Sequence, residues 1–345
     1  MRYLDLCIDS ALSVRDAMRA IDKLPKKIVL VITEGKLCAT VTDGDIRRYL
    51  LRGGNLDDNI LLAANKQPRV ATNLEDAKRI YNEKAYLVVP IVDGNNKLVD
   101  SYCGAEDFNK PKAQLHIPVV INAGGKGTRL YPYTKILPKP LIPVGDLPIL
   151  EHILQGYLQY GCEDFHIIVN YKKDLMKAYF MDNENHYDIS WYDEEQPLGT
   201  GGGLSLLKGK LKDTFFFANC DTLLLANFDS MLRFHREQKN AITMICAYKN
   251  LQIPYGVVQM GANGRIEEMR EKPELSFLTN TGMYIVEPGV LDDIEAGVAI
   301  GFPDIVEREM AKGNNVSVYP ISENDWLDMG QLPELERMRI RLYGK

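Results

Sequence analysis

The sequence predicts an α/β protein in which a mixed, largely parallel sheet follows a smaller α+β module. Two observations predict this arrangement. Strand and helix patterns alternate between residues 117 and 181, which indicates a parallel sheet with helices on both faces. A helix, strand, strand pattern also occurs twice before residue 110. Because 345 residues are many for one hydrophobic core, we expect two domains, residues 1–112 and 116–345.

The first module is expected to consist of two similar halves packed on each other. Apolar spacing and β-branched runs predict a helix at 13–24, strands at 27–32 and 35–41, and a helix that starts at Thr42. The same order recurs at 74–82, 86–92, 97–103 and from 106 onward. A polar segment that contains a proline, residues 109–114, is the expected linker.

The second domain begins with alternating elements. They are a strand at 117–121, a helix at 149–160, a strand at 165–169 and a helix at 173–181. In open sheets of this kind, ligands bind at the carboxyl ends of the strands. We therefore expect the functional residues to follow the strands.

A glycine-rich loop follows the first of these strands. Gly124, Gly125 and Gly127 allow the backbone to approach an anion closely, and Arg129 and Lys139 add positive charge. The pattern is neither a Walker loop nor the dinucleotide fingerprint. It predicts a phosphate-binding loop, and the alternative is a tight connection between a strand and a helix.

Composition excludes several classes of function. The chain has 46% hydrophobic and 26% charged residues, which is ordinary for a globular protein. Its net charge of −6 and the absence of a basic run argue against nucleic acid as a partner. Six cysteines without a CxxC pair argue against a zinc site or a disulfide framework. No apolar segment has the length of a signal peptide or a membrane span, so we expect a cytoplasmic protein without a membrane partner.

Three motifs around the glycine loop resemble the signature of the sugar-1-phosphate nucleotidyltransferases. They are Gly-Gly-Lys-Gly-Thr-Arg-Leu at 124–130, Pro-Lys-Pro-Leu-Ile-Pro-Val at 138–144 and Pro-Ile-Leu at 148–150. The resemblance implies a Rossmann-like domain that joins a nucleoside triphosphate to a sugar 1-phosphate and releases pyrophosphate. It also implies nucleotide contacts from the loop, made by Asn122, Ala123, Gly124, Gly125, Gly127, Thr128 and Arg129.

The segment Pro-Leu-Gly-Thr at 197–200 resembles the base-recognition loop of the same family, which implies nucleotide contacts from Gly199 and Thr200. Five residues before Gly199, the family tends to have glutamine when the base is uracil or thymine, but this chain has Glu194. A carboxylate only accepts hydrogen bonds and therefore matches the adjacent N1–H and N2–H₂ donors of guanine. This favours GTP over UTP, dTTP or CTP, and the alternative is that Glu194 is a solvated surface charge.

Two carboxylates resemble the metal ligands of the family. Asp221 ends the buried strand expected at 215–221, in Asn-Cys-Asp, which resembles the family's Asn-Gly-Asp except at its middle residue. Asp328 lies in Trp-Leu-Asp-Met-Gly, which resembles Trp-x-Asp-x-Gly. The resemblance implies that both hold Mg²⁺, an ion that binds one or two carboxylates together with phosphates and water. The alternative for Asp221 is a cap at the end of a strand.

Three further motifs resemble the sugar side of the family's site: Tyr-Gly at 255–256, Glu-Lys-Pro at 271–273 and Asn-Thr-Gly at 280–282. They imply sugar contacts from Gly256, Glu271, Lys272, Asn280 and Thr281. The implied reaction needs no protein nucleophile, because its difficulty is the repulsion between two anions. The implied catalytic residues are Arg129, Lys139 and Lys272, which are cations that neutralise this charge, and Asp221, which holds the Mg²⁺ ion.

Thr-Asp-Gly-Asp-Ile-Arg-Arg at 42–48 resembles the end of a CBS motif, and the doubled module resembles a CBS pair. This implies an adenine nucleotide near Thr42 and Asp45, and a homo-oligomer. The alternative is that both residues only cap a helix. The second copy, at 103–107, has no threonine at the matching place, so one nucleotide site is expected.

The sugar remains open at this stage. A CBS pair fused to this domain resembles guanylyltransferases of legionaminic acid pathways, which favours glucosamine 1-phosphate. Mannose 1-phosphate and a heptose phosphate are the rivals. A nucleotide-sugar sensor without activity is the alternative of another class.

Overall fold

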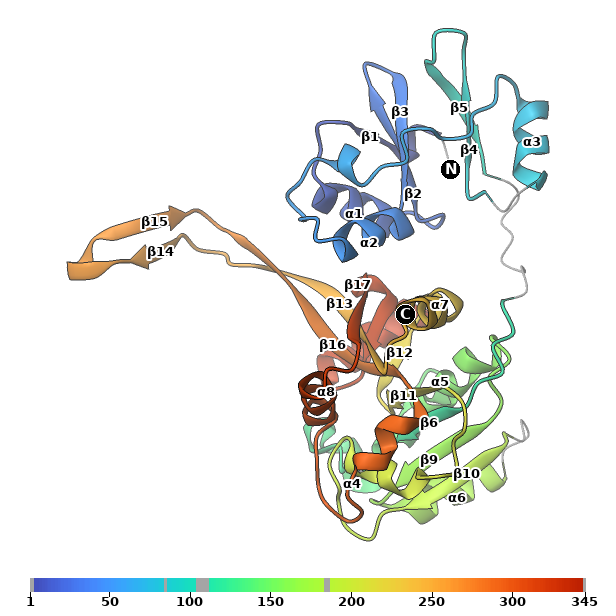
Figure 1. Cartoon of the computed structure of the whole chain (residues 1–345), viewed down its shortest axis with the longest axis vertical. Coiled ribbons are helices and arrows are strands. Elements are labelled where there is room, and N and C mark those ends of the chain that lie inside the picture. Colours follow the sequence, from blue (N-terminus) through green and yellow to red (C-terminus); the bar gives the residue numbers. More distant parts are fainter. Residues whose placement is uncertain (1–2, 84–85, 104–111, 183–186, 344–345) are drawn as a thin grey trace. The chain divides into compact units, whose positions relative to one another are not determined.

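A computed structural model describes residues 3–83, 86–103, 112–182 and 187–343. The chain divides into two compact units, Met1–Lys110 and Pro111–Lys345 (Figure 1). Among the described residues, no helix combines the length and the apolar character that a membrane span needs. The predicted helix from residue 106, residues 109–111 of the predicted linker, and residues 104–107 of the second CBS-like copy lie outside the described residues.

The first half of unit 1 is a three-stranded sheet with two helices. Its elements are β1 (Cys7–Asp9), α1 (Val14–Asp22), β2 (Ile28–Thr33), β3 (Lys36–Thr42) and α2 (Asp43–Leu51). Strand β1 is parallel to β2, and β2 and β3 form an antiparallel hairpin. The buried face of α1, with Val14, Ala17 and Ile21, belongs to one hydrophobic cluster with Val29 and Val41 of the sheet.

The second half of unit 1 contains α3 (Leu74–Glu83) and the antiparallel hairpin of β4 (Val89–Val92) and β5 (Leu98–Tyr102). Its own cluster includes Ala77 and Ile80 of α3. A further cluster joins the halves, since it contains Leu30 of β2 and Leu98 of β5. The two halves therefore pack on each other.

Unit 2 is built on a sheet of seven described strands. In spatial order they are β10 (Ile189–Asp193), β9 (Phe165–Val169), β6 (Val119–Asn122), β11 (Phe215–Asn219), β16 (Glu274–Val286), β13 (Ile242–Gln252) and β17 (Val316–Ser322). The first four are mutually parallel, β16 is antiparallel to both neighbours, and β13 and β17 are parallel. The prediction of a mixed, largely parallel sheet is confirmed.

Helices cover both faces of this sheet. They are α5 (Ile149–Leu158), α6 (Lys173–Met181), α7 (Phe228–Gln238), α8 (Phe302–Ala311) and α9 (Leu332–Tyr343), and the short helix α4 (Tyr133–Ile136) follows the glycine loop. Phe216 belongs to the hydrophobic cluster that includes residues of α5 and α7, whereas Phe215 and Phe217 belong to the cluster that includes residues of α8. Because side chains alternate between the faces, a strand covered on both sides is apolar at every position.

Three two-stranded sheets complete unit 2. Strand β12 (Thr222–Leu224) pairs antiparallel with β18 (Trp326–Asp328), and β7 (Pro143–Val144) pairs with β8 (Leu147–Pro148). The third, β14 (Val257–Met260) with β15 (Ile266–Arg270), continues the long strands β13 and β16 and projects from the sheet (Figure 1).

Candidate active site

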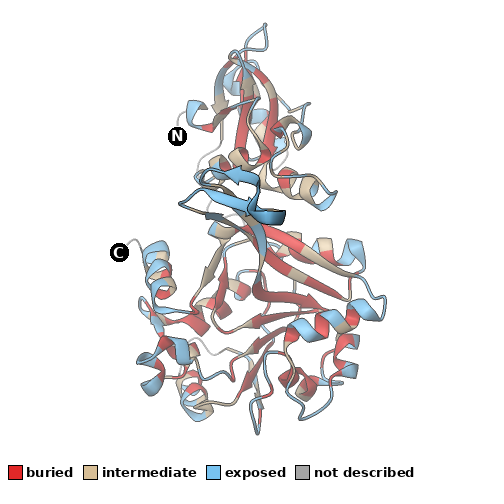
Figure 2. Ribbon diagram, turned by 90° about the vertical axis from the view of Figure 1, so that its left-hand side faces the viewer, coloured by how far each residue is buried: buried red, intermediate tan, exposed pale blue. Residues whose placement is uncertain are grey.

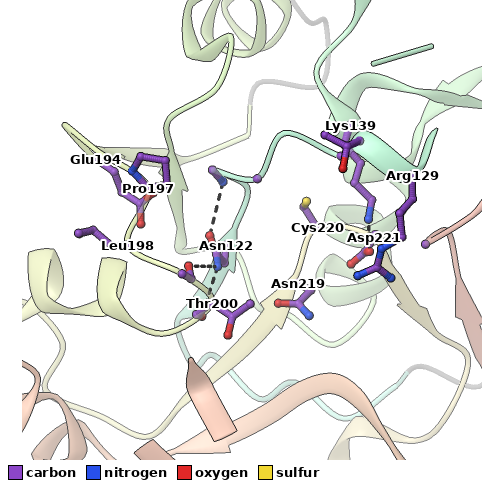
Figure 3. A pocket seen from close by; sticks show the side chains of 16 residues that line it. Asn122, Arg129, Lys139, Glu194, Pro197, Leu198, Thr200, Asn219, Cys220 and Asp221 are labelled. Atoms are coloured by element: carbon purple, nitrogen blue, oxygen red, sulfur yellow. Dashed lines mark hydrogen bonds and ion pairs between the residues drawn. The ribbon is translucent and has the colours of Figure 1, made fainter. Parts of the chain in front are cut away.

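Strands β6 and β11 carry the glycine loop and Asp221 to the same edge of the sheet. The strands are parallel neighbours, with Asn122 in register with Asn219. A cavity of about 420 Å³ lies at this edge (Figure 3). The sequence-predicted residues that line it are Asn122, Gly124, Gly125, Gly127, Thr128, Arg129, Lys139, Glu194, Gly199, Thr200 and Asp221.

Asn122 joins the glycine loop to the segment at 197–200. Its amide Nδ2 donates to the carbonyl oxygens of Gly199 at 3.3 Å and Thr200 at 3.2 Å, and its Oδ1 accepts from the backbone N–H of Gly124 at 3.4 Å (Figure 3). Ala123 is buried and donates its own N–H to Ile168 at 2.8 Å. Asn122 thus positions both loops.

The turn at Gly127 requires glycine. Its φ of 62° is in the left-handed region, and a Cβ there would lie 2.9 Å from Cβ of Lys139. The close approach brings Lys139 to the loop.

Lys139 and Asp221 form an ion pair inside the cavity, and their side chains are only 14% and 17% exposed. Burial by itself lowers the pKa of Lys139, but the charge of Asp221, its hydrogen bond and the charges of Cys220 and Asp328 together outweigh this effect and raise the pKa above its ordinary value. Lys139 is therefore a permanent cation. Arg129 is exposed and lies beside this pair in Figure 3, so a second cation faces the same space.

Asp328 lies next to Asp221 because β18 pairs with β12. Asp328 is in register with Thr222, and the N–H of Met329 donates to the carbonyl oxygen of Asp221 at 2.9 Å. Both carboxylates line a second cavity of about 290 Å³. Burial, followed by the negative charge of Asp221, raises the pKa of Asp328 to about 6.

This pair of carboxylates fits a divalent cation. Two mutually repelling acids at one cavity are stabilised by an ion that neutralises both. The described residues hold no cluster of three or more histidine, cysteine, aspartate or glutamate side chains. Phosphate and water oxygens would therefore have to supply the remaining ligands, as Mg²⁺ accepts.

Glu194 is buried, with 4% of its surface exposed, so it is not a solvated surface charge. Its Oε1 has no hydrogen-bond partner, and burial raises the pKa of this carboxyl to about 7, partly offset by a hydrogen bond to the backbone of Leu198. A Cβ on Gly124 or Gly203 would lie 2.7 or 2.5 Å from its oxygens. The missing side chains of Gly124 and Gly203 therefore leave room for the Glu194 carboxyl group, whose Oε1 has no hydrogen-bond donor beside it.

The structure separates the sequence-predicted sugar residues into two groups. Asn280 and Thr281 line the second cavity together with Asp221 and Asp328. Asn280 donates to Tyr284 Oη at 2.6 Å, and the buried hydroxyl of Thr281 donates to the carbonyl oxygen of Ile245 at 2.8 Å.

Gly256, Glu271 and Lys272 lie instead beside the exposed pair β14 and β15, and they line neither of these cavities. Within β16, Glu274 is six residues from Asn280, about 20 Å along an extended strand. Lys272 lies further out, with a φ of 45°. Contact with a ligand at Asp221 would require the ribbon to fold toward the cavity.

Sequence reasoning missed two asparagines that belong to the site. Asn219 lines both cavities, and Asn170 donates from Nδ2 to the carbonyl oxygen of Glu194 at 2.9 Å. Each stands at or just after the end of a buried parallel strand. A polar residue at the carboxyl end of a buried parallel strand was the sequence feature that could have predicted both asparagines as site residues.

In unit 1, Thr42 and Asp45 form a capping box at the start of α2. Asp45 Oδ2 accepts from the backbone N–H of Thr42 at 2.9 Å and from its hydroxyl at 2.6 Å, while Thr42 Oγ1 accepts from the N–H of Asp45 at 3.1 Å. Ser13 and Asp16 make the same box at the start of α1. The capping function is therefore present, and the nucleotide contact stays a prediction.

The fold and the cavity together define an α/β protein with a glycine loop, two cations and two carboxylates at the carboxyl edge of its sheet. The sequence profile of the nucleotidyl transferase family matches residues 118–341, so the chain belongs to this family.

Relatives and solved structures agree with this assignment. The chain is 32% identical over 239 residues to mannose-1-phosphate guanylyltransferase 1 of Arabidopsis thaliana. The aligned region covers 65% of this chain and 64% of that protein. It is 32% identical over 223 residues to mannose-1-phosphate guanylyltransferase of Mycobacterium tuberculosis, covering 63% and 62%. The matched region therefore spans less than two thirds of the length of these relatives.

Two solved structures share the fold. A putative glucose-1-phosphate thymidylyltransferase from Bacillus anthracis matches with a TM-score of 0.51 and 23% identity, over 65% of this chain and 94% of that one. HddC from Yersinia pseudotuberculosis, complexed with GMP-PN, matches with a TM-score of 0.50 and 19% identity, over 65% and 98%.

Proposed function

We propose that this chain is a sugar-1-phosphate nucleotidyltransferase. The observation that carries the proposal is the convergence of the glycine loop, Arg129, the Lys139–Asp221 pair and Asp328 at one edge of the sheet, in a chain of the nucleotidyl transferase family. The test is pyrophosphate release from each of the four nucleoside triphosphates with glucosamine, N-acetylglucosamine, mannose and glucose 1-phosphates. Release with none of these pairs would contradict the proposal and favour a nucleotide-sugar sensor.

The reaction is an in-line displacement. A phosphate oxygen of the sugar 1-phosphate attacks the α-phosphorus, the bond to the β-phosphate oxygen breaks, and pyrophosphate leaves. Arg129 and the N–H groups of the glycine loop hold the leaving pyrophosphate, and Lys139 holds the attacking phosphate. When Mg²⁺ is bound to Asp221 and Asp328, it supplies further charge neutralisation at the reacting phosphates. Cys220 takes no part as a nucleophile, because burial raises the pKa of its thiol to about 12.

We propose GTP as the donor. Glu194 lines the cavity with a buried carboxyl group whose Oε1 has no hydrogen-bond partner, and guanine offers two adjacent donors that fit a carboxylate. The names of the relatives, which are guanylyltransferases, support the same base. Asn170 holds the backbone of Glu194 in place through its hydrogen bond.

The variant Glu194→Gln tests this donor. Because the pKa of Glu194 is about 7, the ionised fraction falls about tenfold between pH 8 and pH 6, and we expect kcat/KM for GTP to fall by the same factor in the wild type. Glutamine does not titrate, so the variant should lose the tenfold part of the pH dependence that Glu194 contributes. It should also lose at least tenfold in preference for GTP over UTP. A variant that kept both the pH profile and the preference would exclude Glu194 from base recognition. Initial rates with both nucleotides across this pH range give the measurement.

Glucosamine 1-phosphate is the acceptor that we propose, on the resemblance of the doubled N-terminal module joined to this domain. Mannose 1-phosphate is the second candidate, because the relatives carry its name. The sugar contacts of Glu271 and Lys272 remain predictions. They can form only if the two-stranded ribbon of β14 and β15 folds toward Asp221.

Unit 1 is proposed to bind an adenine nucleotide at Thr42 and Asp45. If it does, Asp45→Ala should weaken the binding of ATP or AMP at least tenfold, because a charged hydrogen-bond partner is lost. The matched control is Asp16→Ala, which removes the same capping interaction from α1. Both variants should lose about 1 kcal/mol of stability. Equal nucleotide affinity in the two variants, measured by calorimetry, would leave Asp45 a helix cap only.

A further inference from the structure

The segment that follows β9 contacts several parts of the site. Strand β9 is buried at all five positions, and buried strands form the centre of unit 2 in Figure 2, so the segment starts from a fixed base. Asn170 donates to the carbonyl oxygen of Glu194 at 2.9 Å. The N–H of Tyr171 donates to the carbonyl oxygen of Gly124 in the glycine loop at 3.4 Å. Two parts of the site are thus joined to one buried strand.

Helix α4 depends on contacts with other segments. It has only four residues, and a single turn of helix is not stable by itself in water. Hydrophobic packing contributes little, because Tyr133 and Ile136 are 41% and 75% exposed and Thr134 is the one buried residue of this helix. Hydrogen bonds to the carbonyl oxygens of α4 must therefore hold it in place.

Tyr171 and Lys172 supply these hydrogen bonds. Tyr171 Oη donates to the carbonyl oxygen of Thr134 at 3.3 Å. Lys172 Nζ donates to the carbonyl oxygens of Lys135 at 2.6 Å and Ile136 at 2.7 Å. Carbonyl groups at the end of a helix have no partner within the helix, and a cation is a favourable partner for them. Three consecutive carbonyl groups of α4 are therefore held by two consecutive side chains.

The backbone of Lys172 is in an unusual conformation. Its φ of 50° lies in the left-handed region, which is unfavourable for residues other than glycine. Lys172 immediately precedes α6, but its side chain makes no capping hydrogen bond to that helix. A conformation of this kind persists where other contacts offset its cost, and the two hydrogen bonds to α4 are such contacts.

The position of α4 determines the position of Lys139, which stands three residues after Ile136. A Cβ on Gly127 would lie 3.0 Å from Thr134 Cγ2 and 2.9 Å from Lys139 Cβ, so α4, Lys139 and the glycine loop are in close contact. A shift of α4 would therefore move the ammonium group that pairs with Asp221.

We propose that Lys172 is a positioning residue for phosphate transfer. By holding the last two carbonyl groups of α4, it fixes Lys139 at the place where the attacking phosphate binds. This inference rests on the proposed function, in which Lys139 holds the phosphate of the sugar 1-phosphate. Lys172 itself lines neither of the two cavities, so it acts through Lys139. A misplacement of about 1 Å at such a group lowers a rate by as much as about a hundredfold.

Lys172→Met tests the proposal in the full chain, because methionine has an unbranched side chain of similar length but donates no hydrogen bond. With the nucleotide and sugar 1-phosphate that give the highest turnover, kcat should fall, and KM for the sugar 1-phosphate should rise, each at least about tenfold. KM for the nucleotide should change less than about threefold, since Asn170 and Tyr171 keep their contacts. A general loss of folded protein would lower kcat but leave both KM values unchanged.

Three further variants make the result specific. Lys135→Met is the matched control, since it removes the same charge from the exposed side of α4 itself, and it should keep kcat and both KM values within about twofold. Lys172→Arg keeps a cationic donor and should restore most of the turnover. Lys172→Gly also removes the donor but relieves the unfavourable φ, so it should fold with the wild-type Tm and show the kinetics of Lys172→Met.

Hydrogen exchange tests the hold on α4 without any turnover. In Lys172→Met, the amides between residues 133 and 139 should exchange at least about tenfold faster than in the wild type, and those of β9 should not change. Wild-type kinetics or wild-type exchange in Lys172→Met, or equal effects in Lys135→Met, would overturn the proposal. A wild type without turnover would instead contradict the proposed function, and the exchange rates would still decide whether Lys172 holds α4.

Discussion

Replacing Arg129 by alanine is expected to lower the turnover for pyrophosphate release by about a thousandfold, as for other arginines that neutralise transferred phosphates. Arg129 lines the cavity beside Lys139 and Asp221, and its exposed side chain is free to turn toward a ligand. Because the charge on pyrophosphate grows in the transition state, the loss should appear in kcat more than in KM for the nucleotide.

Lys126→Ala is the matched control. Lys126 is an exposed cation on the same loop but does not line the cavity. It should change turnover less than about threefold, since an exposed charge away from the ligand is screened. Turnover near the wild-type value in Arg129→Ala would remove Arg129 from the mechanism, and equal losses in both variants would indicate a general charge effect.

Replacing Asp221 by asparagine is expected to lower turnover by on the order of a thousandfold or more, because a carboxylate that would hold the charge-neutralising metal is lost. The variant should also be less stable by about 3 kcal/mol, since buried Lys139 keeps its charge but loses its ion-pair partner. Steady-state rates and urea unfolding measure the two effects separately.

The double variant Asp221→Asn with Lys139→Met separates folding from chemistry. Removing both charges should restore most of the stability, because the double variant no longer buries the charge of Lys139 without its ion-pair partner. Turnover should stay as low as in the single variant. Recovery of turnover together with stability would remove both Asp221 and Lys139 from the mechanism.

Much of unit 2 could be predicted from local patterns. The helix predicted at 173–181 is α6 with the same bounds, and the one predicted at 149–160 ends two residues earlier, at Leu158. The strand predicted at 165–169 is β9. Continuous apolar runs such as 215–218 predict strands covered on both faces, because each face of the sheet needs its own apolar residues.

Other features of the site depend on residues far apart in the chain. The burial of Glu194 depends on Gly124 and Gly203, whose missing side chains leave the space for its carboxylate. The approach of Asp328 to Asp221 depends on the pairing of β18 with β12. A short sequence motif specifies neither the burial of Glu194 nor the approach of Asp328 to Asp221, because burial and strand pairing depend on how the whole unit packs.

The sequence by itself determined the chemical types of the residues at the site, their order and the alternation of strands and helices, since side-chain periodicity and turn residues act over a few positions. Only the tertiary structure decided that Glu194 is a buried acceptor, that Asp221 and Asp328 share a cavity, and that Lys272 lies on an exposed ribbon. Solvent exposure and charge pairing arise when distant segments pack together, and the pKa of about 7 at Glu194 is a consequence of that packing.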